Sequence, residues 1–124
     1  MQPSDDLAHE ILELTIDAGG TWDVGLSSTV PVLTAGTYTG VTDVTEITHG
    51  TLTRATAAWA TPSGRSVIPL ADVSLGTASD DCTAVAWILY DGTDVVWASR
   101  IADLNIAAGS TVTLPKEAIR LTIP

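Results

Sequence analysis

The stretch VAWILYDGTDVVWAS at residues 85–99 constrains the fold of this 124-residue chain more than any other part of the sequence. An Asp-Gly pair between two apolar runs is among the strongest short-range signals of a β-hairpin. A hairpin with one face on a core and one face in water alternates apolar and polar residues. This hairpin is apolar at nearly every position of its first arm, so both of its faces need a cover.

The length of the turn determines where Trp87 and Trp97 point. A two-residue turn at the Asp-Gly pair places Thr93 opposite Tyr90, and a four-residue turn places Val95 there. Side chains alternate between faces with a period of two, so in both cases the two tryptophans lie on opposite faces. Only an odd turn length would set Trp87 directly across from Trp97.

These turns divide the hairpin into a core face and a second face. The core face would hold Val85, Trp87, Leu89, Val96 and Ala98. The second face would hold Ala84, Ala86, Ile88, Tyr90, Val95 and Trp97. Because a monomer rarely leaves a large apolar patch in water, we expect a helix of the same chain or a neighbouring subunit to cover the second face. Trp97, Tyr90 and Ile88 are therefore candidate interface residues.

The N-terminal segment predicts one short helix at residues 4–17. Ser4 can cap it, Asp5–Asp6 suit the positive end of the helix dipole, and Gly19–Gly20 end it. Large apolar residues in this helix follow the spacing i, i+4, i+7 and form one stripe: Leu7, Ile11 and Leu14. This stripe needs a partner, either the rest of the domain or a neighbouring subunit.

After the helix, Gly, Pro, Thr and Asp punctuate short apolar segments, which is typical of an all-β domain. The predicted strands are residues 21–28, 50–59, 66–75, the hairpin, 110–114 and 118–123. Pro69 favours an edge strand or a bend, and residues 28–50 have no firm period and are expected to be loop or irregular edge strand. We predict a single domain over residues 1–124, with the helix at 4–17 and an antiparallel, Ig-like or jelly-roll-like β-sandwich at 21–124.

Few residues point to a chemical site. His9 and His49 have no metal-ligand spacing, and Cys82 follows Asp80–Asp81, whose charges oppose thiolate formation. The pair Asp91 and Asp94 could hold calcium, but Asp-Gly in a hairpin is chiefly turn chemistry. We therefore expect no catalytic residue, no cofactor and no metal, and a protein that is not an enzyme.

The charge balance restricts the partners. The chain has 15 acidic residues against 5 basic ones, and the basic ones are scattered. Nucleic acids and anionic membranes both require clustered cations, so neither is an expected partner. The N-terminus has no basic region typical of a signal peptide, and a single cysteine suits a reducing cytoplasm.

The order of features resembles a family of small virion structural proteins of tailed phages, of the head-decoration or minor tail-fibre-like kind. The resemblance runs from TWDVGLSS through GTLTRATAAWATPSG to AVAWILYDGTDVVWASRIADLNIAAGSTVTLPKEAIRLTIP. Leu52 departs from the pattern, because members tend to carry an aromatic residue at that position. The resemblance implies a β-sandwich, a role in virion assembly and no catalytic residues.

These observations predict a structural protein of the virion, made in the host cytoplasm, most simply a decoration protein on the outer surface of the capsid. Its partners would be the major capsid protein or neighbouring virion subunits, and it would be a homo-oligomer on the particle. One alternative is a minor tail or fibre-associated protein, although a tail fibre usually needs a long shaft. Another is a free-standing carbohydrate- or peptide-binding β-sandwich, which could use Trp22, Trp59, Trp87 or Trp97 as a stacking platform for sugars.

Overall fold

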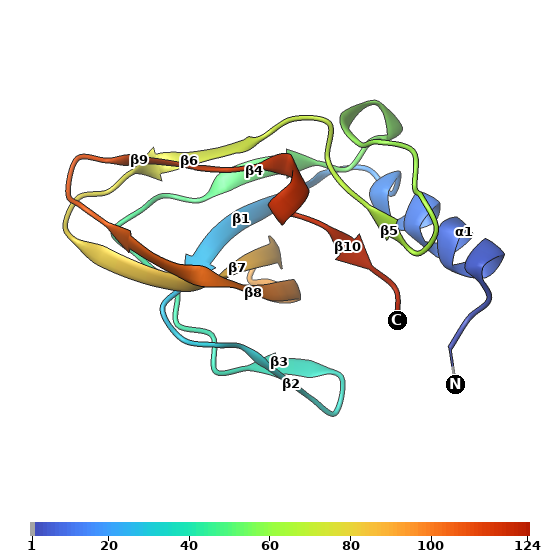
Figure 1. Cartoon of the computed structure of the whole chain (residues 1–124), viewed down its shortest axis with the longest axis horizontal. Helices are drawn as coiled ribbons and strands as arrows, with labels where there is room; N and C mark the ends of the chain where they lie inside the picture. The colour runs from blue at the N-terminus through green and yellow to red at the C-terminus, as the bar shows by residue number, and fades with distance from the viewer. Residues whose placement is uncertain (1) are drawn as a thin grey trace.

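The computed structural model describes residues 2–124, which form one N-terminal helix followed by short strands (Figure 1). Every strand pair in that range is antiparallel. In chain order the elements are helix α1 (Asp5–Ile16), strands β1 (Thr21–Ser27), β2 (Val32–Thr34), β3 (Thr37–Thr39) and β4 (Gly50–Thr53), 3₁₀ turn η1 (Thr56–Ala58), strands β5 (Ser66–Val67), β6 (Val73–Thr77), β7 (Cys82–Asp91), β8 (Asp94–Ile106) and β9 (Thr111–Leu114), 3₁₀ turn η2 (Lys116–Ala118) and strand β10 (Leu121–Thr122).

The strands build a two-layer structure of small, open sheets. One layer is a four-stranded sheet in the order β4-β1-β7-β8, and the pairs β6–β9 and β5–β10 form the other. Both layers contribute to one core, which includes Trp22, Val24, Leu26, Leu52, Trp87 and Leu89 from the first and Val67, Val73, Leu75, Val112, Leu114 and Leu121 from the second. The predicted mainly β, antiparallel sandwich with one N-terminal helix is confirmed. The finer Ig-like or jelly-roll-like topology stays a prediction.

Helix α1 packs against the sandwich, but with a different stripe from the one predicted. The Ser4 hydroxyl accepts a hydrogen bond from the Leu7 backbone N–H at 3.2 Å and so caps the helix. The buried residues are Ala8, Leu12 and Ile16, with the spacing i, i+4, i+8. Because the Ala8 side chain is small, the first turn of the helix can approach the sandwich closely. The face with Ala8, Leu12 and Ile16 therefore packs on the core.

The hairpin turns one residue later than the Asp-Gly pair, because Asp91 pairs with Asp94 and the turn residues are Gly92 and Thr93. Tyr90 lies opposite Val95, as in the longer of the two predicted turns.

A β-bulge follows in β8 and places Trp97 opposite Leu89. The extra residue reverses the alternation of side chains. The prediction that Trp87 and Trp97 lie on opposite faces is therefore wrong, since both lie on the core face. Val96 sits in the bulge and Ala98 pairs with Ile88 on the second face, so neither belongs to the predicted core face.

The chain itself covers part of the second face of the central sheet. Residues 42–44 pair along the edge of β1, where the Ser28 N–H donates to the Thr42 carbonyl and the Val44 N–H donates to the Leu26 carbonyl, both at 2.9 Å. From there the side chains of Asp43 and His49 reach over Gly25 and Tyr90. A Cβ atom on Gly25 of β1 would come within 2.8 Å of His49 Nε2, so this cover sits directly on the backbone of the sheet. The Thr42 N–H donates to the Ser27 hydroxyl at 3.1 Å, and Ile88 is fully buried beneath. Neither the helix nor a neighbouring subunit is needed to cover Ile88.

Elsewhere the strands are shorter than the sequence predicts. The segment 50–59 ends as a strand at Thr53 and continues into η1. The segment 66–75 is broken into β5 and β6 by a bend at residues 70–71, directly after the buried Pro69, which pairs with Trp59. Residues 28–50, expected to be irregular, contain the β2–β3 hairpin. Within residues 2–124, no helix has the length and apolar character needed to cross a membrane.

Candidate functional site

Residues 28–42, which we call the arm, carry β2 and β3 and extend beyond the edge of the sandwich in Figure 1, with β3 lying near β8. Val30, Val32 and Leu33 of the arm are 43%, 55% and 59% exposed. The sequence has no Asp, Glu, Lys or Arg between Asp23 and Asp43, although the whole chain has a net charge of −10. The arm is therefore an uncharged apolar projection on a strongly acidic body.

The arm ends in a tight turn with an unfavourable residue. Thr34 pairs with Thr37 across the turn residues Ala35 and Gly36, whose φ angles are 50° and 81°. Two residues with positive φ define the hairpin turn in which Asn-Gly is preferred and alanine is costly. Local strain of this kind concentrates at positions that function maintains.

Two of the three helix residues predicted for an interface are exposed. Leu7 is 48% exposed and Leu14 is 69% exposed, while Ile11 is half-buried. Because Ala8, Leu12 and Ile16 dock the helix, the stripe of Leu7, Ile11 and Leu14 stays on the outer side of α1. It remains a candidate contact surface.

The three hairpin residues predicted for an interface are not brought together on a free surface. Ile88 is fully buried by the chain itself, so its assignment to an interface is wrong. Trp97 is half-buried and packs against the core cluster. Tyr90 is half-buried on the opposite face, where it contacts residues 40–49.

Asp43, His49 and Tyr90 form a polar cluster that the sequence did not reveal. The Asp43 Oδ1 atom lies 2.8 Å from His49 Nε2 and accepts a hydrogen bond from the Tyr90 hydroxyl at 3.4 Å. The His49 ring stacks on the Tyr90 ring at a centroid distance of 4.9 Å. Partial burial and the adjacent Asp43 carboxylate raise the pKa of Tyr90 to about 12. The cluster anchors the cover of residues 40–49 on the central sheet.

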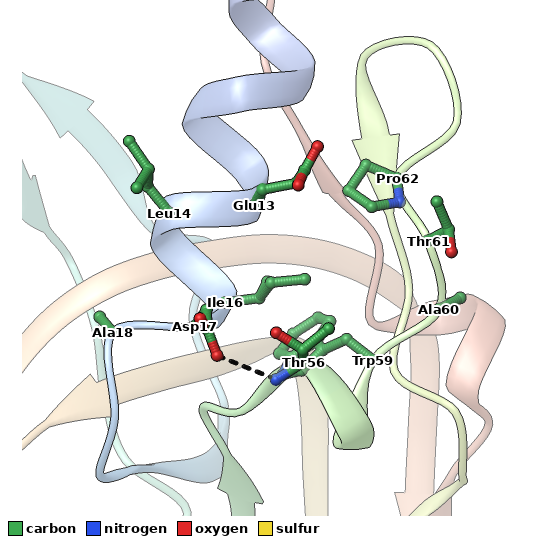
Figure 2. A pocket seen from close by; sticks show the side chains of 10 residues that line it. All are labelled: Glu13, Leu14, Ile16, Asp17, Ala18, Thr56, Trp59, Ala60, Thr61 and Pro62. Atoms are coloured by element: carbon green, nitrogen blue, oxygen red, sulfur yellow. Dashed lines mark hydrogen bonds between the residues drawn. The ribbon is translucent and has the colours of Figure 1, made fainter.

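A groove of about 450 Å³ runs between the last turns of α1 and residues 56–62. Ile16 and Trp59 lie at its base, and the Glu13 side chain points toward Pro62 across it (Figure 2). Asp17 also lines the groove, and its Oδ1 atom accepts a hydrogen bond from the Thr56 N–H at 3.2 Å. These residues are far apart in the sequence, so no local motif could have predicted the groove.

The other residues considered for chemistry lie apart from one another. His9 Nε2 contacts Glu13 Oε1 at 2.5 Å on the helix surface. Partial burial and the carboxylates of Glu46, Asp81 and Asp80 raise the pKa of the Cys82 thiol, which opposes thiolate formation as expected. Within residues 2–124, no group of three or more His, Cys, Asp or Glu side chains could hold a metal ion.

Comparison with known proteins finds no matching family model, no matching curated protein and no matching solved structure.

Proposed function

We propose that this chain is a non-enzymatic structural protein of a phage virion that decorates the outer surface of the capsid. The observation that carries the proposal is the arm, with its exposed Val32 and Leu33. Exposed apolar groups on a soluble protein typically mark a contact with another protein. An arm that projects from a compact body can reach a neighbouring subunit without rearrangement of the sandwich.

The distribution of charge supports an exterior position. The net charge of −10 would be repelled by packaged DNA and keeps many copies soluble at high local concentration. Because the arm has no charged residue, it can be buried against the major capsid protein or a neighbouring copy without desolvating a carboxylate. The acidic body would then face the solvent.

The outer stripe of α1 offers a second contact. Leu7 and Leu14 are exposed and Ile11 is half-buried between them. Helix-in-groove docking uses apolar residues at such spacings. We propose that the stripe contacts a neighbouring virion subunit. Where that subunit is another copy of this chain, the contact makes the chain a homo-oligomer on the particle. A minor tail or fibre-associated role would use the same arm and stripe.

A carbohydrate-binding role has less support, because a stacking platform needs an exposed indole face. Trp22, Trp59 and Trp87 are each at most 3% exposed. The Nε1–H groups of Trp59 and Trp87 donate to the carbonyls of Thr53 and Ala118. Three of the four tryptophans are therefore structural.

Co-sedimentation of purified chain with particles that lack it tests the proposal. Replacing Val32 and Leu33 by serine should lower the particle-bound fraction at least about tenfold, since a buried apolar anchor is worth about 2 kcal/mol. The melting temperature should stay the same because both side chains are exposed. Leu70→Ser is the matched control, since Leu70 is 53% exposed and lies outside the arm. Equal binding by the arm variant and the parent would contradict the proposal.

A further inference from the structure

We propose that the groove between α1 and residues 56–62 binds a basic, apolar segment of a partner protein. This inference stands on the groove alone and does not depend on the virion role. The groove is separate from the arm but borders the outer stripe of α1, because Leu14 belongs to both. It would add an acidic site to the two apolar contacts proposed above.

The shape and lining of the groove suit a peptide side chain with apolar neighbours. Its volume is about 450 Å³. The buried side chains of Ile16, Trp59 and Pro62 form its base, and Leu14, which is 69% exposed, is the apolar side chain of the lining that an occupant can reach. Figure 2 shows Ile16 above Trp59 at the base, between the helix and the segment that carries Pro62. Apolar floors with a few placed polar groups are the usual form of a binding site.

The charge of the lining selects a cationic occupant. Glu13 and Asp17 are the charged residues among those that line the groove, and none of the lining residues is basic. Each carboxylate uses one oxygen within the chain, Glu13 toward His9 and Asp17 toward the Thr56 N–H. Among residues 2–124 the second oxygen of each makes no hydrogen bond or ion pair, which leaves it available to a Lys or Arg side chain.

The same charges argue against a second copy of the chain or a nucleic acid as the occupant. A second copy has only 5 basic residues against 15 acidic ones, so it offers few cationic segments for this groove, whereas contact between copies through the uncharged arm is unaffected. Phosphates would be repelled by Glu13 and Asp17. A partner segment with one Lys or Arg beside apolar residues would pair with the carboxylates of Glu13 and Asp17 and contact the apolar residues of the lining. Electrostatic complementarity of this kind sets the specificity of docking.

Selection from a displayed library of random peptides, about twelve residues long, tests the proposal on the whole chain. We expect the enriched peptides to share a Lys or Arg next to apolar residues. The variant Glu13→Gln with Asp17→Asn should bind a selected peptide at least about tenfold more weakly. The amide introduced by Asp17→Asn keeps an oxygen that can accept from the Thr56 N–H, so the melting temperature should be preserved.

Glu10→Gln is the matched control, because Glu10 is exposed on the same helix but does not line the groove. It removes one negative charge and should change the affinity by less than about twofold. The absence of an enriched consensus, a consensus without Lys or Arg, or an equal loss in the Glu10 variant would each overturn the proposal.

Discussion

At the scale of single residues, Asp43, His49 and Tyr90 determine how the central sheet is covered. One carboxylate oxygen of Asp43 contacts both rings, and the rings stack on each other. Gly25 beneath them has no room for a side chain, since its Cβ would clash with His49. These side chains, together with the backbone pairing of Asp43 with Ser27, hold residues 42–49 against the sheet.

The Tyr90 hydroxyl predicts a loss of stability at alkaline pH. An unfolded tyrosine has a pKa of about 10, whereas in the folded chain the pKa of Tyr90 is about 12. Between these values the unfolded state binds fewer protons than the folded state, so the free energy of unfolding falls as the pH rises. Tyr90→Phe should reduce this fall in thermal melts across that pH window, while Tyr38→Phe should leave it as in the parent. The same slope in all three proteins would contradict the assignment.

At the scale of elements, helix α1 shows which of two apolar stripes docks. Leu12 is fully buried and Leu14 is 69% exposed, although both are leucines on one short helix. The stripe that docks consists of Ala8, Leu12 and Ile16, and it is narrow at its first position because the alanine side chain is small. The outer stripe of Leu7, Ile11 and Leu14 is consequently available to a partner.

Leu12→Ala should destabilise the chain by about 2 to 5 kcal/mol, because it leaves a cavity in the core. Leu14→Ala should change the free energy of unfolding by less than about 0.5 kcal/mol, because it removes only exposed surface. Urea denaturation of the two variants measures both values. A larger loss for the Leu14 variant would mean that the predicted stripe, and not Ala8, Leu12 and Ile16, holds the helix.

The sequence predicted those elements whose signals are local. Ser4 and the Gly19–Gly20 pair indicated the ends of the helix, and the Asp-Gly pair indicated the hairpin. The bulge that places Trp97 on the core face could not be predicted, because alternation assumes that no residue is inserted. The position of residues 42–49 was also missed, since one isolated bridge and a few long-range side-chain contacts leave no period in the sequence.

At the scale of the whole molecule, the candidate surfaces were predicted only in part. Sequence spacing identified the outer stripe of α1, and the arm has a signal of its own in its lack of charged residues between Asp23 and Asp43. The groove arises where residues 13–18 meet residues 56–62, a long-range contact that no local pattern encodes. The resulting molecule is an acidic sandwich that carries an uncharged arm and an acidic groove.

The most direct measurement of the proposed role is electron cryo-microscopy, with mass spectrometry of the same sample, of virus particles purified from the source that encodes this chain. We expect the chain to be present in many copies, as density on the outer capsid surface with residues 28–42 seated on a neighbouring subunit. Absence of the chain from the purified particles, or density confined to the interior, would contradict the account.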